Sequence, residues 1–121
     1  MTATIDARKF AHAQYAKLLD ETIENMKQLA SLKGGEYAGD DDRLANFRRN
    51  AEQNLVMYEV VWNIYCSKHW DAIQQYIKDK QRGISRKRLE SLSSRCDDII
   101  VYMTLFKAML FEAEETDNAD E

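Results

Sequence analysis

The feature that most constrains the fold is an apolar pattern near the C-terminus, in which successive residues are spaced alternately by three and four positions. It consists of Leu89, Leu92, Cys96, Ile99, Met103, Phe106 and Leu110. Side chains at this spacing share one face of an α-helix, so we expect a helix that turns this face toward a core. Asp98 and Tyr102 lie four residues apart beside the stripe, which can place Asp98 at a cleft between helices.

Three further helices are predicted upstream. Residues 6–32 repeat the alternating spacing with Tyr15, Leu19, Thr22, Met26 and Leu29. A short helix runs through Leu44, Phe47 and Ala51, and a third long helix over 56–80 is apolar on more than one side. The chain has no proline and only four glycines, so strand and turn signals are scarce. We therefore predict an all-α fold, a helical bundle of three long helices and one short helix.

The length of 121 residues suits a single domain. We place this domain at residues 1–111 and predict that residues 112–121 form a disordered tail, because they hold six carboxylates and no base. The net charge of −4 comes from this tail, since residues 1–111 carry 17 basic and 15 acidic residues. A body so nearly balanced in charge gives no reason to expect direct binding of nucleic acid.

The sequence also indicates the cellular compartment in which the protein is located. No apolar run reaches the length of a membrane span, and the N-terminus has no signal-peptide core. Cys66 and Cys96 are too few and too widely spaced for a zinc site, and both lie in apolar helical patterns. We expect two buried free thiols in a reducing environment. The predicted location is the cytoplasm, with no membrane association.

The segment Lys33–Arg48 joins the first two predicted helices and combines glycines, a run of acidic residues and aromatic side chains. Gly34 and Gly35 are expected to end the first helix. The aspartates at 40–42 repel one another unless water, a cation or helix amides take up their charge. One interpretation is that they cap the short helix, and the other is that their charge serves a ligand.

A second connection, over residues 79–88, is strongly basic. Gly83 is placed to end the third helix, and Ser85 to cap the fourth. We interpret the segment as a solvated turn, with phosphate binding as an alternative that charge alone supports.

Several familiar catalytic motifs are missing from the sequence: a glycine-rich phosphate loop after a strand, paired cysteines and His-Glu-x-x-His. His12 and His69 lie on different helices without a nearby nucleophile, so we interpret both as structural. What remains is a set of carboxylates on the loop and the helices. Helical bundles bind divalent metals through inward-facing carboxylates, and Mg²⁺ suits a site made of oxygen ligands.

The loop also carries a resemblance. Residues 33–48 resemble the "K-x-x-D-Y-x-G … D-x-L-x-N-F" signature of small phage and prophage proteins related to the all-α, MazG-like nucleotide pyrophosphatases and to nucleotide-modification-associated domains. Residues 65–73 resemble the lysine-bearing central helix of that group, and residues 95–102 resemble its final helix. The similarity spans about three-fifths of the chain, from Lys33 to Met103.

The resemblance implies a nucleotide-binding protein that uses Mg²⁺ and hydrolyses a nucleoside triphosphate. Carried over by position, it implies that the pocket is shaped by Tyr37, Asp42, Asn46 and Phe47. It further implies that Lys68 meets a phosphate and that Asp71 and Asp98 help to hold magnesium.

The sequence departs from that group where catalysis is concerned. It has no Glu-Glu-x-x-Glu motif, and Arg95 stands three residues before Asp98, where an acidic ligand is expected. Arginine cannot ligate a metal. The alternative hypothesis is therefore a non-enzymatic phage accessory protein that binds and inhibits a host enzyme or defence system.

The third helix also predicts self-association. It is apolar all round and bears Trp62, Tyr65, Trp70 and Tyr76. A bundle can bury such an excess in a second copy of the chain, so we expect a homo-oligomer. The other possibility is that the first and last helices cover it within one chain.

Overall fold

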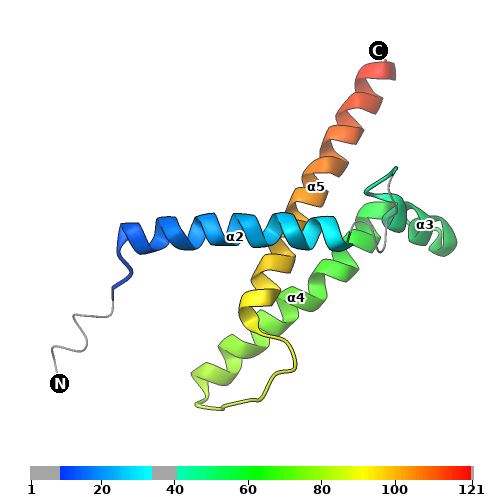
Figure 1. Cartoon of the computed structure of the whole chain (residues 1–121). Helices are drawn as coiled ribbons and strands as arrows, with labels where there is room; N and C mark the ends of the chain where they lie inside the picture. Colours follow the sequence, from blue (N-terminus) through cyan, green and yellow to red (C-terminus); the bar gives the residue numbers. More distant parts are fainter. Residues whose placement is uncertain (1–8, 34–40, 121) are drawn as a thin grey trace, which may run out of the picture.

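The computed structural model describes residues 9–33 and 41–120. These residues form four helices and no strand, in the order α2 (His12–Lys33), α3 (Ala45–Asn54), α4 (Tyr58–Gln81) and α5 (Leu92–Asp120) (Figure 1). The prediction of an all-α fold with three long helices and one short helix is confirmed. Gly34, Gly35 and Asp40 lie outside the described residues.

The helices pack around an antiparallel pair formed by α4 and α5 (Figure 1). The short helix α3 packs on α4, while α2 crosses α5. Apolar residues that α3, α4 and α5 turn toward one another form the core: Leu44, Phe47, Ala51, Val61, Val101, Leu105 and Met109. Trp62 ties the central pair together, because its Nε1–H donates to the backbone oxygen of Tyr102 at 2.7 Å and its ring lies 4.7 Å from that of Phe106.

The face of α5 that enters the core is only in part the one that the regular stripe predicted, because Phe106 is the stripe residue that packs against the core cluster. Val101, Leu105 and Met109 are buried, whereas Met103 and Leu110 are about half exposed and Cys96 is exposed. The stripe failed as a guide because α5 carries apolar residues on both sides, and only packing against α4 and α2 selects one of them. Of the two expected buried thiols, only Cys66 is buried, and burial raises its pKa.

The helix ends match the expectations in part. Gly83 follows α4 with a φ of 71°, a left-handed conformation that glycine adopts without steric cost. The cap of α5 is Ser91, whose Oγ accepts from the Ser94 backbone N–H at 3.0 Å, and not Ser85. At α3 the N-cap position is Leu44, and the carboxylate of Asp42 instead accepts from the Leu44 N–H at 2.9 Å, just before the helix.

The basic linker after α4 is folded around an aspartate. Asp79 is 2% exposed and accepts hydrogen bonds from Gln75 at 2.9 Å and from Arg86 at 2.8 and 3.1 Å, with Arg88 at 3.5 Å. These partners hold the pKa of the Asp79 carboxyl down to about 2, with the hydrogen bond from Arg86 as the largest cause. One carboxylate thus holds two of the linker's arginines against the end of α4 and offsets one of their two positive charges.

Helix α5 continues through the acidic C-terminal segment to Asp120. The first residue of this segment is anchored to the rest of the molecule. Glu112 pairs with Arg48 and accepts a hydrogen bond from the Tyr58 hydroxyl at 2.8 Å.

Within the described ranges, no helix is both long and apolar enough to cross a lipid bilayer.

Candidate functional site

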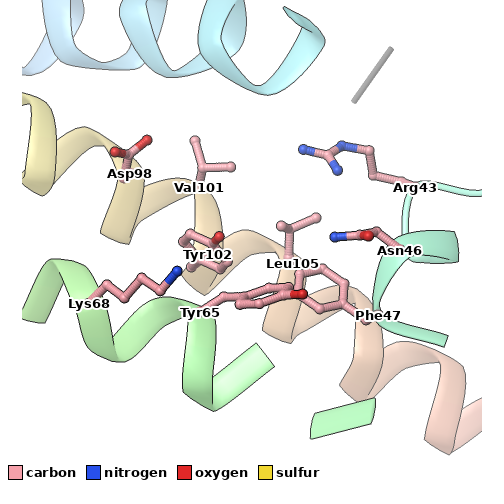
Figure 2. A pocket seen from close by; sticks show the side chains of 9 residues that line it. All are labelled: Arg43, Asn46, Phe47, Tyr65, Lys68, Asp98, Val101, Tyr102 and Leu105. Carbon is pink, nitrogen blue, oxygen red and sulfur yellow. The ribbon is translucent and has the colours of Figure 1, made fainter. Parts of the chain in front are cut away.

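A pocket of about 400 Å³ opens between α3, α4 and α5, close to the core (Figure 2). Three short stretches line it: Arg43, Asn46 and Phe47 at the start of α3; Tyr65 and Lys68 on α4; and Asp98, Val101, Tyr102 and Leu105 on α5. The residues on α4 and on α5 are spaced by three or four, which brings them to one face of each helix. Arg43 joins them from the turn before α3. The local helical repeat therefore assembles the pocket wherever the three elements meet.

Aromatic rings form one wall of the pocket. The ring of Phe47 lies 6.1 Å from that of Tyr65 and 6.4 Å from that of Tyr102, the second pair being edge-to-face. Val101 and Leu105 add aliphatic surface beside them. Such a wall can receive a flat ring by stacking or edge contacts.

Two cations reach the pocket from opposite sides, Arg43 near α3 and Lys68 on α4 (Figure 2). Arg43 is half-buried, and its Nη2 has a long hydrogen bond of 3.4 Å to the backbone oxygen of Ala30. Burial lowers the pKa of this guanidinium, yet arginine keeps its charge. The Lys68 ammonium lies 5.8 Å from the centre of the Tyr65 ring. In the described part of the chain neither cation forms an ion pair, so the pocket presents positive charge that an anion can take up.

The acidic side of the pocket is Asp98, which is only 3% exposed. Its Oδ2 lies 3.4 Å from Nδ1 of His69, and the Arg95 guanidinium lies 3.1 Å from the same ring nitrogen. Burial, with the charge of Asp98 as a second cause, raises the pKa of Tyr102 to about 12. The Tyr102 hydroxyl is therefore protonated at neutral pH and can donate a hydrogen bond into the pocket.

A charge network outside the pocket holds the start of α3. The Arg48 Nε donates to Asp42 at 2.7 Å, its Nη2 pairs with Glu112, and its guanidinium lies 5.4 Å from the centre of the Tyr58 ring. Hydrogen bonds from Arg48 lower the pKa values of both Asp42 and Glu112. Asp42 thus fixes the turn that presents Arg43 and does not itself line the pocket.

The fit of a magnesium ion can be judged from the oxygen donors near Asp98. His69, Glu90 and Asp98 offer ligand atoms that lie within 4.8 Å of one another. However, the Arg95 guanidinium lies 3.4 Å from Glu90 and 3.1 Å from the His69 ring nitrogen, and so already places a positive charge beside this group. One ligand would also be a nitrogen, whereas Mg²⁺ prefers oxygen. The described side chains alone do not suit magnesium.

The structure brings four of the predicted site residues into one pocket: Asn46, Phe47, Lys68 and Asp98. Asp42 lies next to it in the charge network. Asp71 is exposed on α4 and belongs neither to the pocket lining nor to the group around Asp98. Tyr37 lies outside the described residues.

Sequence reasoning missed Arg43, Tyr65 and the pairing of His69 with Asp98. The signal for Tyr65 was present, because it precedes Lys68 by three residues on one helix, whereas Arg43 lies in the turn before α3 begins at Ala45. Residues at that spacing share a helix face. His69 had no such signal, since its partner is 29 positions away on another helix.

Comparisons of the chain with protein-family models, with curated proteins and with solved structures give no match.

Proposed function

We propose that the pocket binds a nucleotide. The observation that carries the proposal is the pair of cations, Arg43 and Lys68, which flank an aromatic wall without an ion pair in the described part of the chain. A nucleotide combines the two chemistries that this arrangement complements, a flat ring and a polyanion. The resemblance of residues 33–103 to MazG-like nucleotide pyrophosphatases supports the same interpretation.

The pocket offers a place for each part of such a ligand. The base would lie against Phe47, Tyr65 and Tyr102, and base–aromatic stacking contributes about 1–3 kcal/mol. The Asn46 amide can donate and accept at the base edge. The phosphates would lie toward Arg43 and Lys68. The volume of about 400 Å³ falls in the usual range for small-molecule sites.

We propose binding and not hydrolysis, and any Mg²⁺ would reach the pocket bound to the phosphates of the nucleotide. Mg²⁺ commonly binds through substrate phosphates and few protein carboxylates. Hydrolysis by a bound metal would need a coordinated water held by fixed ligands. A single carboxylate, Asp98, lines the pocket among the described residues, so we do not assign a catalytic step to this site.

Titration calorimetry with ATP, GTP and their deoxy forms, with and without Mg²⁺, tests this function. Charge-assisted hydrogen bonds contribute about 1.5–3 kcal/mol, so Arg43→Ala and Lys68→Met should each weaken binding at least tenfold. Lys78→Met is the matched control, because Lys78 is exposed on the same helix away from the pocket. Binding that is equally strong in all three variants, or undetectable at millimolar nucleotide in the wild type, would refute the proposal.

A second candidate function is the accessory protein that binds and inhibits a host enzyme. It is favoured by apolar side chains exposed at the start of α4, of which Met57 is 66% and Ile64 56% exposed. An inhibition assay with Met57→Lys and Arg43→Ala separates the two functions, since the first substitution lies on this surface and the second in the pocket. Loss of inhibition in Met57→Lys alone would favour the accessory protein.

A further inference from the structure

The apolar stripe of α2 continues along the whole helix, but only its C-terminal half is covered. Met26, Leu29 and Ala30 pack against the core cluster. Upstream, the α2 arm consists of Tyr15, Leu18, Leu19 and Ile23, which are 56, 48, 45 and 37% exposed. This half of the helix extends away from the other helices (Figure 1). Four large apolar side chains are thus aligned on a helix without a neighbour in the described chain.

A second uncovered stripe lies on α5. It consists of Cys96, Met103 and Leu110, with Phe111 beside Leu110; Met103, Leu110 and Phe111 are 50, 49 and 58% exposed. The first three residues are seven positions apart, the repeat by which helices pair in coiled coils. This α5 stripe faces away from the core formed by Val101, Leu105 and Met109.

One chain cannot bring its arm onto its own stripe. α2 is a continuous helix of 22 residues whose C-terminal half is fixed on the core. Folding the arm back would require a break in the middle of the helix, and the segment has neither proline nor glycine to favour one. Within the described residues nothing covers either surface, so we look to another molecule for the cover.

We propose that the occupant is a second copy of the chain, with the α2 arm of each copy packed on the α5 stripe of the other. A two-fold pair satisfies both surfaces at once, because each copy supplies one arm and one stripe. A half-exposed large side chain leaves on the order of 100 Å² uncovered, judging from aromatic side chains. The seven large residues therefore offer roughly 700 Å² per copy, close to the area per partner of a standard interface.

The wild-type chain should sediment as a dimer of about 28 kDa, twice 14.1 kDa, at micromolar concentration. Leu19→Glu in the arm and Met103→Lys in the stripe should each give a monomer with unchanged helical circular dichroism, because both residues are exposed in the single chain. Ile77→Lys, at a 53% exposed position on α4 outside both surfaces, is the control and should leave the dimer intact.

Mixing the Leu19→Glu and Met103→Lys variants tests the reciprocal geometry. In a mixed dimer, one arm–stripe contact is wild type on both sides. The other contact brings the two substituted positions together, and the charges introduced there are opposite, so the mixture should dimerise again. If instead arm packed on arm, or stripe on stripe, every contact in the mixed dimer would contain one unpaired introduced charge. The mixture would then stay monomeric. A monomeric wild type, or a dimer that resists both substitutions, would overturn the proposal and leave these surfaces for a different protein.

Discussion

Tyr102, Asp98 and His69 illustrate how single residues depend on neighbours that are distant in sequence. His69 comes from α4 and Asp98 from α5, and the ring of Tyr102 lies 5.6 Å from that of His69. Asp98 is buried next to a tyrosine whose ionisation it opposes. The consequence for the pocket is that the Tyr102 hydroxyl stays protonated at neutral pH.

We expect this coupling to be visible in a tyrosine titration. The pKa of Tyr102 is raised to about 12, first by burial and then by the charge of Asp98. Asp98→Asn removes that charge and should lower the pKa of Tyr102, while burial keeps it above its ordinary value of 10. Ultraviolet absorbance at alkaline pH measures the change, and Tyr102→Phe identifies the step. An unaltered titration in Asp98→Asn would show that the two groups do not interact.

At the scale of elements, the connection between α4 and α5 is ordered by one carboxylate. Gly83 allows the turn, and Arg86 and Arg88 then fold back onto Asp79 at the end of α4. The ring of Tyr76 lies 5.1 Å from the Arg88 guanidinium and 5.8 Å from the Lys80 ammonium. The linker is therefore part of the packed structure, and it sets where α5 begins.

The stability of this linker should depend on acid pH. The pKa of Asp79 is lowered to about 2 from 3.8, so its contribution to folding is fully present above about pH 4 and is lost as pH falls toward 2. Asp79→Asn should lower the melting temperature at pH 7 and flatten its fall between pH 4 and 2. Asp71→Asn is the control, because Asp71 is exposed on the same helix. Equal acid sensitivity in Asp79→Asn and wild type would contradict this role.

At the scale of the whole molecule, the described chain buries few apolar residues and exposes many. The buried core consists of seven residues packed as one cluster, whereas Tyr15, Leu18, Met103 and Phe111 are among the large apolar side chains left at the surface. A second copy that covers them would contribute to the stability of each chain. Unfolding would then be coupled to dissociation.

Thermal unfolding should accordingly depend on protein concentration. A tenfold rise in concentration adds about 1.4 kcal/mol per dimer and should raise the melting temperature by a few degrees. Met103→Lys should remove this dependence, and Ile77→Lys should keep it. Differential scanning calorimetry over a hundredfold range of concentration makes the comparison. A wild-type melting temperature that is constant over this range would argue against a dimer.

The amino-acid sequence by itself determined the helices and part of the surface that lines the pocket. Local spacing sets which residues share a helix face, so Asp98 could be grouped with Tyr102 before their helices were placed. Asn46 and Phe47 were brought together only by the family resemblance. The scarcity of helix breakers made the all-α class predictable for the same local reason. Gly83 marked the end of α4 because the left-handed backbone there favours glycine.

Only the tertiary structure decided how those faces are used. Half of the regular stripe of α5, formed by Cys96, Met103 and Leu110, lies outward because α4 and α2 pack on the opposite side, through Val101 and Leu105. The reversal of the chain after α4 brings Arg86 to Asp79, and the packing of α4 on α5 brings His69 to Asp98. Such pairings join residues from different elements, and the helical repeat carries no information about which elements meet. The pocket was thus present in the sequence as separate helix faces and became a site only when the helices packed.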